Sequence, residues 1–462
     1  CCLLLFVVVC VVVVVAPVAV VAVVVDDVDD VVDGAAAVWS GGGVAIVPFV
    51  LLSLMLLLLW TLVGMIPAQD VKPRFRLPEA TYDYLTLRMP RGLSGVPLPR
   101  RSDTADRERQ NATATLGRVL FYDRQLSANH SRSCASCHQQ RRGFADASRR
   151  SKGFRGQRTH RNSMSIANLR FHRGNLFWDG RTRRLEDLVL MPIADEIEMG
   201  LPVRDLIQRL RADRGYDPLL LAAFGSVEVT RERIASALAA FVRAIVSLQS
   251  RFDAGYAVAG DVAVDFANFS ASENRGKAMF YGVNGSVAQS CAACHVERVP
   301  SPCVNAYTVN AVMLSSSRPR NNGLDGGAGR DDQGLSVVSG RSEDRGKFRA
   351  PSLRNIEVTG PYMHDGRFQA LAEVVKFYAH RVQLHANLDH VLRPDARGGG
   401  AWARAGHRSG NAVTIGSPVR TVGAPPGFPM GSREQRDLVA FLRTLTDHEL
   451  LRAPRFSDPF VR

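Results

Sequence analysis

The chain has 462 residues, 46% of them hydrophobic and 22% charged, which is the composition of a globular protein with more than one domain. Its formal net charge is +14, but the arginines are spread along the chain after residue 70 without aromatic interleaving or a nucleic-acid motif. We therefore interpret the basic charge as a solvated face. This argues against a nucleic-acid site and leaves an anionic membrane or an acidic redox partner as contacts.

The N-terminal segment, residues 1–69, is apolar and differs from the rest of the chain. It carries no charge over residues 34–69, and within this stretch residues 44–68 are long enough for a membrane span or for the apolar core of an export signal. No Lys or Arg precedes Lys72, so the positive region of a signal peptide is missing, and the positive-inside rule taken alone would keep the C-terminal part in the cytoplasm. We expect the part before about residue 44 to be sequence upstream of the true start. Within residues 1–69, the apolar stretch 44–68 is then expected to form an export signal or an inner-membrane anchor of a periplasmic protein.

Two related domains are expected after this segment. Residues 70–109 are rich in Pro and Arg and predict an extended linker. The first domain is expected over residues 110–254, where LGRVLFYD precedes a cysteine pair, and the second over residues 255–462, where RGKAMFYG does the same. Duplicate helices before duplicate cysteine pairs imply an internal repeat.

The sequence SCASCH at residues 133–138 returns as SCAACH at residues 290–295, in a chain with only 8 cysteines and 11 histidines. C-x-x-C-H is the attachment pattern of c-type haem. Cysteines three apart on one helical turn can each form a thioether to a haem vinyl group, and the next histidine can ligate the iron. The alternatives, a zinc site of two C-x-x-C pairs or a redox dithiol, need no histidine after both pairs. The sequence predicts two covalent haem c groups, held by Cys134, Cys137, His138, Cys291, Cys294 and His295.

Two later stretches have the apolar periodicity of helices. Residues 231–252 have apolar residues at alternating steps of four and three, with Thr230 in position to cap the helix. Residues 432–445 have a similar apolar set, with Ser432 and Gln435 in capping-box positions. We expect these helices to close the two domains. The stretches without periodicity are expected to be long loops around the second haem: 301–346 and 393–431.

Several motifs follow one another in the order found in bacterial dihaem cytochrome c peroxidases and their MauG-type relatives, which the chain resembles over roughly residues 110–450. The resemblance implies a mostly α-helical fold of two cytochrome c-like haem domains packed across a shared interface, with long loops and here an N-terminal apolar segment. The motifs that carry it, besides the two C-x-x-C-H sites, are LFYDRQLSANHSRSCASCH, RNSMSIANL, FWDGR, LMPIADEIEMG, FRAPSLRN and TGPYMHDGRF.

The resemblance implies that the haem of the first domain reacts with peroxide. Glu198 of EIEMG matches a distal glutamate, and a carboxylate beside an open iron face can take a proton from peroxide and return it to the leaving oxygen. Without the motif, Glu198 would be interpreted as a surface carboxylate. Pro192 matches a distal-pocket proline. Leu188 stands where many members have glutamine, so one polar contact to peroxide is expected to be absent.

The sixth ligand of this first haem is expected to be missing. Reductively activated peroxidases of the family have a histidine seven residues before the Arg-Asn pair, and this chain has Phe154 there. A phenylalanine cannot ligate iron. His160 lies nearby as a substitute, but it stands in the wrong register, directly beside Arg161. We therefore expect a high-spin haem with an open face.

At the second haem, two residues compete for the sixth position. Tyr378 stands fourteen residues after His364 of the HDG motif, where the resemblance places methionine in some peroxidases and tyrosine in MauG-type proteins. We favour Tyr378, whose phenolate would stabilise Fe(III) and higher states. Met363 is the alternative, because methionine is the commoner partner of histidine on a c-type haem and would raise its potential.

The resemblance also assigns residues between the two haem sites. Trp178 of FWDGR matches a tryptophan that can relay an electron or hole, although a packed core tryptophan is the plain alternative. Asn162, Thr359 and Pro361 match positions whose oxygen atoms hold one calcium ion, a hard cation that oxygen ligands suit. Cys303 is an additional thiol, either a buried small hydrophobe or a reactive surface site.

Three functions are compatible with these features. The first is a peroxidase that reduces hydrogen peroxide with electrons from a small cytochrome c or a cupredoxin, which enter through the second haem. The second is a MauG-like enzyme that uses peroxide to oxidise aromatic residues of a partner protein. The third is a dihaem electron carrier without peroxide chemistry. The family as a whole favours the first, whereas Tyr378 and Phe154 favour the second.

Overall fold

The computed structural model describes residues 75–87, 104–172, 174–283, 290–296, 314, 316, 318–327, 331–394 and 426–461. Residues 73–462 form one compact unit. Within the described ranges, no helix combines the length and the apolar character needed to cross a bilayer. The apolar stretch at residues 44–68, Cys303 and most of the two predicted long loops lie outside these ranges.

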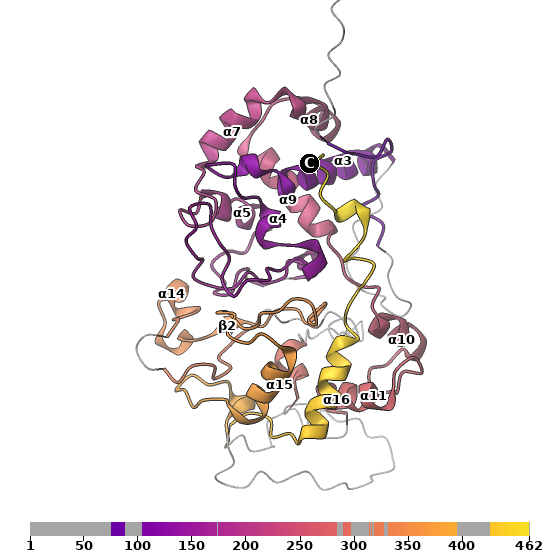
Figure 1. The fold of residues 1–462 in the computed structure, drawn as a ribbon, viewed down its shortest axis with the longest axis vertical. Helices are drawn as coiled ribbons and strands as arrows, with labels where there is room; N and C mark the ends of the chain where they lie inside the picture. Colours follow the sequence, from indigo (N-terminus) through magenta and orange to yellow (C-terminus); the bar gives the residue numbers. More distant parts are fainter. Residues whose placement is uncertain are drawn as a thin grey trace, which may run out of the picture. The chain divides into compact units, whose positions relative to one another are not determined.

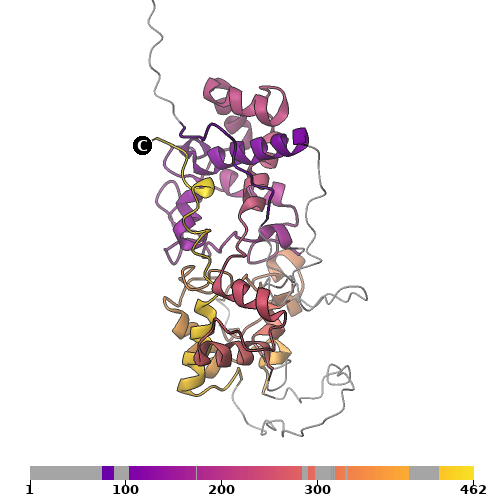
Figure 2. The same ribbon diagram turned by 90° about the vertical axis from the view of Figure 1, so that its right-hand side faces the viewer.

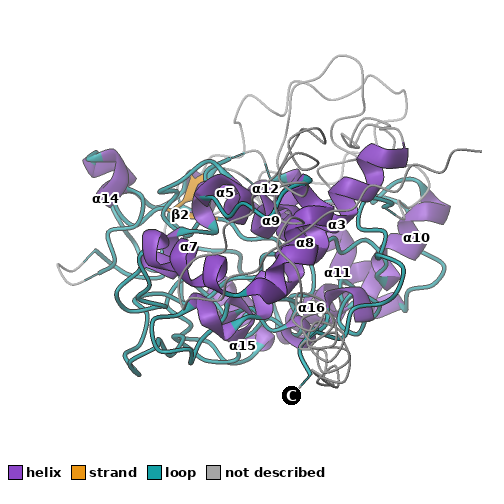
Figure 3. Ribbon diagram, turned by 90° about the horizontal axis from the view of Figure 1, so that it is seen from above, coloured by secondary structure: helices purple, strands orange, loops and turns teal. Residues whose placement is uncertain are grey.

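The described part consists mainly of helices joined by loops, as Figure 3 shows, with one short antiparallel ladder. The mostly α-helical fold class is therefore confirmed. The α-helices are α3 (Thr104–Tyr122), α4 (Cys134–Cys137), α5 (Leu185–Leu188), α6 (Met191–Ala194), α7 (Val203–Ala212), α8 (Asp217–Phe224), α9 (Arg231–Ala244), α10 (Arg251–Ala259), α11 (Ala271–Tyr281), α12 (Ala292–His295), α14 (Ser336–Ser339), α15 (Leu371–His380) and α16 (Ser432–Arg443). The ladder pairs β1 (Pro319–Arg320) with β2 (Phe348–Arg349).

The helices form two groups, which we call the first lobe (around α3 and α9) and the second lobe (around α11 and α16) (Figure 1). In the first lobe, α3 and α9 approach most closely where Gly117 faces the carbonyl of Ala237. A Cβ atom at Gly117 would lie 1.8 Å from that oxygen, so the contact requires glycine. One turn further along, the rings of Phe121 and Phe241 pack with their centroids 5.2 Å apart.

The second lobe repeats this arrangement. A Cβ atom at Gly276 on α11 would lie 1.9 Å from the carbonyl oxygen of Asp437 on α16. The centroids of Phe280 and Phe441 are again 5.2 Å apart. The two similar stretches found in the sequence are thus helices in equivalent places, each packed by the same glycine and phenylalanine spacing.

The helix predicted over residues 231–252 is shorter than expected, which corrects that prediction. Its start is confirmed, since the Thr230 hydroxyl accepts a hydrogen bond of 3.2 Å from the N–H of Arg233. However, α9 ends at Ala244, and α10 begins after a capping box formed by Ser250 and Asp253.

The backbone between α9 and α10 is extended. Its N–H groups donate hydrogen bonds to side-chain oxygen atoms instead of to helical carbonyls. The N–H of Ser247 donates to Oδ1 of Asn168 at 2.8 Å, and the N–H of Leu248 donates to the Asp447 carboxylate at 3.0 Å. The chain passes here from the core of the first lobe to that of the second.

The last long helix, α16, is confirmed with a shift of one residue at its cap. Gly431 occupies the N-cap position, and its N–H donates to Oε2 of Glu434 at 2.7 Å. Ser432 is already the first helical residue, and Gln435 donates to the Met430 carbonyl. Glutamate at the third helical position explains why the cap lies one residue earlier than predicted, although Gly431 has no side chain and only this half of a capping box forms.

The chain ends on the first lobe after leaving α16, which Figures 1 and 2 show from two directions. The Tyr122 hydroxyl donates to the carbonyl of Phe456 at 2.6 Å. Residues 75–87, expected as part of a linker, also pack here: Tyr84 is buried, and its hydroxyl donates to the carbonyl of Arg455 at 3.1 Å. Segments far from the first C-x-x-C-H motif in sequence therefore complete the lobe that contains it.

Polar contacts join the two lobes. Arg161 donates to both carboxylate oxygens of Asp332, at 2.6 and 2.8 Å. The N–H of Asn162 donates to the carbonyl of His364 at 2.7 Å. Two charge-assisted bonds from one guanidinium fix orientation as well as distance.

Candidate functional site

The first C-x-x-C-H motif forms the short helix α4. Its turn begins with a capping box in which the N–H of Ser133 donates to Oγ of Ser136 at 3.0 Å. Nδ1 of His138 lies 2.9 Å from the carbonyl oxygen of Phe144, so Nδ1–H donates to it and Nε2 remains available for a metal. Burial lowers the pKa of His138, which keeps the imidazole in the neutral form that a metal requires.

A cavity, which we call the first cavity, lies beside α4. Its volume is about 680 Å³ including the part open to solvent, which is the size of a cofactor site. The predicted residues of the first haem site line it together: Cys134, Cys137, His138, Leu188, Pro192 and Glu198. Leu188 contributes an apolar wall at the position where many members have a polar amide.

Glu198 is the carboxylate of this cavity. Its N–H donates to Oδ1 of Asp195 at 2.9 Å, and its carbonyl accepts from the N–H of Phe154 at 3.0 Å. Burial, followed by repulsion from Asp195, raises the pKa of Glu198 to about 7, although the positive charge of Arg181 lowers it. Such a carboxyl group can accept and return a proton near neutral pH.

No second histidine faces His138 in the part of the cavity that the structure describes. The ring of Phe154 packs against Gly200, where an added Cβ atom would lie 2.2 Å from the ring, and it does not line the cavity. His160 is exposed and also lies outside the lining. The described wall therefore offers no sixth histidine ligand.

The second C-x-x-C-H motif lies at α12. Nδ1 of His295 is 3.3 Å from the carbonyl oxygen of Pro351, the same type of contact that His138 makes. Burial lowers the pKa of His295 to about 4. The adjoining second cavity has a volume of about 1200 Å³ including open space. The predicted residues that line it are Trp178, Cys291, Cys294, His295, Met363 and Tyr378.

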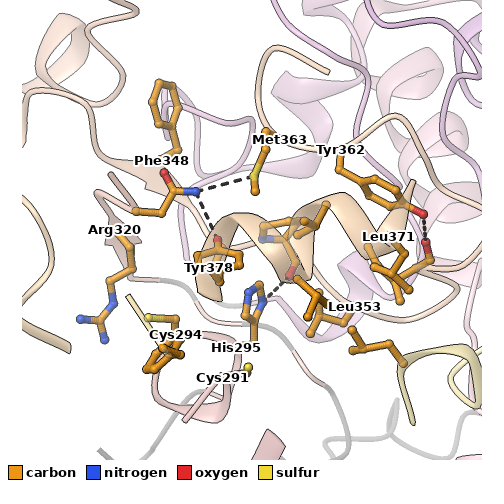
Figure 4. Close-up of a pocket in the computed structure, with 18 of the residues that line it drawn as sticks. Cys291, Cys294, His295, Arg320, Phe348, Leu353, Tyr362, Met363, Leu371 and Tyr378 are labelled. Carbon is orange, nitrogen blue, oxygen red and sulfur yellow. Dashed lines mark hydrogen bonds between the residues drawn. The ribbon is translucent and has the colours of Figure 1, made fainter. Parts of the chain in front are cut away.

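One side-chain amide donates hydrogen bonds to both candidate sixth ligands of this site, as Figure 4 shows. Nδ2 of Asn322 donates to Oη of Tyr378 at 3.2 Å and to Sδ of Met363 at 3.6 Å. Both side chains line the second cavity, so the geometry brings the two candidates together and leaves both in reach. Burial raises the pKa of Tyr378, whereas the Asn322 hydrogen bond lowers it.

Trp178 lines the second cavity, although it is far closer in sequence to the first motif. Its indole N–H donates to the carbonyl of Asn162 at 2.8 Å, and its ring meets the imidazole of His364 edge-on. The first cavity does not include Trp178 among its described lining residues. This tryptophan therefore lies at the contact between the lobes, on the side of the second cavity.

The three predicted calcium positions are buried, but no hydrogen bond joins them to one another among the described residues. The amide nitrogen of Asn162 donates to the carbonyls of Ser148 and Arg149, which leaves Oδ1 free to face another ligand. The Thr359 hydroxyl donates to a carbonyl at 3.4 Å. Pro361 contributes only a backbone oxygen. The donors are neutral oxygen atoms, which suits a hard cation.

The pKa values of the four motif cysteines are all raised, which disfavours dithiol exchange. Burial raises the pKa of Cys134 to about 12 and that of Cys137 to about 11, and it raises the pKa of Cys291 and of Cys294 to about 12. Zinc ligation and disulfide exchange both use the thiolate, which a lowered pKa favours. In the described residues, no group of three or more His, Cys, Asp or Glu side chains could hold a metal ion. Each pair instead faces a cavity that can hold a macrocycle.

Comparison with known proteins agrees with this reading. Residues 111–261 match the family model described as di-haem cytochrome c peroxidase. The chain is 30% identical over 378 residues to the methylamine utilization protein MauG of Methylorubrum extorquens, covering 81% of this chain and 84% of that one. It is 32% identical over 283 residues to the cytochrome c551 peroxidase of Nitrosomonas europaea, covering 61% and 77% of the two chains. The chain therefore belongs to the dihaem cytochrome c peroxidase and MauG family.

A solved structure gives the same result for the fold. The crystal structure of a MauG-like protein associated with microbial copper homeostasis superposes with a TM-score of 0.56 at 30% identity, covering 83% of this chain and 98% of that one. The protein is an oxidoreductase of the dihaem peroxidase class, and haem is its cofactor.

Besides the ion pair of Arg320 and Asp389, sequence reasoning missed two polar groups in the second cavity and one near the first. Asn322 and Arg349 line the second cavity, and Asp195 lies beside Glu198. Arg349 lies inside the FRAPSLRN motif and Asp195 inside LMPIADEIEMG, so the motifs were the available signal. Asn322 lies outside the quoted motifs, and only the fold brings it to Tyr378.

Proposed function

We propose that this protein is a c-type dihaem peroxidase that reduces hydrogen peroxide at the first cavity, with electrons that enter through the second. In this proposal, the first lobe is the peroxidatic haem c domain (residues 110–254), and the second lobe is the electron-transfer haem c domain (residues 255–462). Both haems are covalently attached. The observation that carries the proposal is Glu198, a carboxyl group with a pKa near neutrality in an apolar cavity beside a free His138 Nε2.

The haem would supply an iron centre that binds peroxide and exchanges electrons with it. His138 would hold the iron through Nε2, with its other nitrogen fixed by Phe144. Glu198 would take the proton from one peroxide oxygen and deliver it to the other, so that the O–O bond breaks with water as the leaving group. Two electrons and two protons then convert one peroxide into two waters. Leu188 and Pro192 would exclude bulk water from this exchange.

Electrons are proposed to come from a small cytochrome c or a cupredoxin and to enter at the second lobe. Trp178 supports this route, because it lines the second cavity and its indole donates to a first-lobe carbonyl. The basic charge of the chain suits an acidic donor. A periplasmic location follows from covalent haem attachment in this family, and the apolar segment 1–69 is proposed as its export signal or anchor.

A calcium ion is proposed between the lobes, held by oxygen atoms of Asn162, Thr359 and Pro361. The support is the orientation of Asn162, whose amide nitrogen is engaged by two carbonyls while its Oδ1 faces away from them. A neutral set of oxygen ligands predicts weak binding that chelators can reverse.

The second candidate function is a MauG-like oxidation of aromatic residues in a partner protein. Tyr378 favours it, since a phenolate at the second iron would disfavour Fe(II) and let the second lobe share oxidising equivalents. Met363 on the same Asn322 amide favours the peroxidase instead. A plain dihaem electron carrier fits less well, because it has no use for the carboxyl group of Glu198.

The test is Glu198→Gln in the holoprotein. The amide cannot accept the proton, so the second-order rate with peroxide is expected to fall by about 10²- to 10⁴-fold while both haems are retained. Glu196→Gln is the matched control, since Glu196 is an exposed carboxylate two residues away. An unchanged rate in Glu198→Gln, measured by stopped flow, would remove this residue from the proposed reaction.

A further inference from the structure

The second cavity contains a buried arginine that has no counter-ion in the described part of the chain. Arg349 is only 6% exposed, and it lines this cavity from β2. Its Nη2 donates to Sδ of Met164, which carries no charge, and its Nε has no hydrogen-bond partner. None of the described carboxylates forms an ion pair with it. Burial lowers the pKa of Arg349 to about 10, so the side chain is still a cation at neutral pH.

Two other arginines of the second lobe are ion-paired. Arg320, on the neighbouring strand and in the same cavity, donates to Asp389 at 2.6 Å. Arg354 donates to both oxygens of Asp253, at 2.6 and 2.8 Å. A buried charge without a partner is strongly unfavourable, and proteins almost always provide one. Arg349 is the exception among these three.

Among the described residues no anion remains for Arg349, so a group bound in the cavity is a candidate for its counter-ion. Asp389 is the only carboxylate among the described residues that line the cavity, and Arg320 already neutralises it. The two arginines and one aspartate therefore leave one positive charge unbalanced. A planar guanidinium pairs best with a carboxylate, which it can bind through two parallel hydrogen bonds.

We propose that Arg349 binds a propionate carboxylate of the haem in the second cavity and thereby sets both its position and its reduction potential. This inference rests on the proposed haem of the second lobe. Other anions fit less well, because the remainder of the wall is mainly apolar and would not solvate a small ion. The propionate is the one acidic part of an otherwise apolar macrocycle.

The backbone of Arg349 also links the proposed propionate contact to Trp178. Its N–H donates to the carbonyl of Trp178 at 2.9 Å. The indole of Trp178 in turn donates to the Asn162 carbonyl at 2.8 Å. A haem held by this guanidinium is thus fixed relative to the tryptophan between the lobes. Arg349 is a positioning residue in this arrangement, and it does not react itself.

The test is a potentiometric titration of the holoprotein, with each haem followed by its own absorption bands. Removing a buried positive charge stabilises the oxidised iron, so Arg349→Met is expected to lower the potential of one haem only. The expected shift is at least tenfold in the ratio of oxidised to reduced haem, which is 59 mV for a one-electron couple. Arg349→Lys keeps the charge and should restore most of the potential. Arg318→Met, an exposed arginine next to the same ladder, should change neither haem.

The outcomes separate this inference from the function it rests on. If a haem stain shows no haem at Cys291 and Cys294, the proposed second haem is absent and both proposals fail. If both haems are present and Arg349→Met leaves both potentials unchanged, only the propionate contact is wrong. Should Arg349→Met not retain haem, Arg349→Gln carries the same prediction with a neutral hydrogen-bond donor. Equal shifts in the two haems would also contradict the assignment.

Discussion

The pH dependence of the peroxide reaction tests the environment of Glu198 directly. With a pKa of about 7, half of the Glu198 carboxyl groups are ionised at pH 7, and about one in ten at pH 6. The ionised form is the base, so the rate should fall about tenfold per pH unit below this midpoint. Asp195→Asn keeps Oδ1 for the hydrogen bond to Glu198 but removes the negative charge that raises its pKa.

The expected size of the pKa shift in Asp195→Asn follows from the partly solvated position of Asp195 and Glu198. An interaction of about 1 kcal/mol corresponds to roughly 0.7 pH unit, because one unit is about 1.4 kcal/mol. The midpoint should therefore move down by that amount in Asp195→Asn, and the rate at pH 6 should rise about fourfold. Because burial is the larger cause of the shift, the midpoint should stay above the ordinary value of 4.5.

A substitution that should raise the pKa of Glu198 provides a second test. Arg181 lowers the pKa of Glu198, so Arg181→Gln should move the midpoint up. Asp205→Asn, which removes an exposed charge from α7, should leave it in place. Stopped-flow rates of the holoproteins between about pH 5 and pH 8 give all four midpoints. If Asp195→Asn and Arg181→Gln shift the midpoint in the same direction, or not at all, the acid limb belongs to another group.

Three further predictions follow from the two cavities and the repeat. Denaturing gels stained for haem should show about half of the wild-type signal in Cys134→Ala/Cys137→Ala and none when Cys291 and Cys294 are also replaced; an unstained wild-type band would contradict covalent attachment. Tyr378→Met should raise the potential of one haem by on the order of 100 mV, within the roughly 0.8 V that axial ligands span. If Met363→Leu shifts the potential and Tyr378→Met does not, methionine is the ligand. Gly276→Ala should lower the free energy of unfolding by about 1–3 kcal/mol, since its Cβ would lie 1.9 Å from the Asp437 carbonyl; Gly431→Ala, where the nearest atom would be 3.6 Å away and φ is negative, is the control without a clash.

Local sequence signals predicted the elements that depend on neighbours in the chain. Thr230 caps α9 as expected, because its hydroxyl needs only the N–H of Arg233 three residues later. The apolar spacing, however, predicted a helix that continues past the observed end of α9 at Ala244. Ile245 and Leu248 keep the helical spacing and are both buried, yet they belong to the cores of different lobes. What ends the helix is Asn168 and Asp447, which take over the backbone hydrogen bonds from far along the chain. No local pattern contains that information.

At the candidate site, too, motifs predicted some residues, whereas others could be found only in the folded structure. The spacing of C-x-x-C-H predicts Cys134 and His138 because it is part of the chemistry, whereas Glu198 was predicted by the family resemblance alone. The motifs could not reveal that Tyr378 and Met363 accept hydrogen bonds from one amide, since Asn322 lies 56 and 41 residues away from them, respectively. Nor could they reveal that no described carboxylate pairs with Arg349, because an ion pair is a property of the folded interior.

The repeat duplicates the scaffold but not the polar groups of the two cavities, and this difference assigns their roles. Both lobes pack a glycine against a carbonyl, and both fix the first nitrogen of the C-x-x-C-H histidine through a backbone oxygen. The first cavity then adds a carboxyl group that can move a proton and provides no second histidine in its described wall. The second adds an oxygen and a sulfur that can bind iron, together with an unbalanced positive charge. Proton transfer is needed where peroxide is cleaved, whereas a second axial ligand and a compensating charge tune a centre that only exchanges electrons. The proposed direction of electron flow, from the second lobe to the first, rests on this difference between the groups of the two cavities.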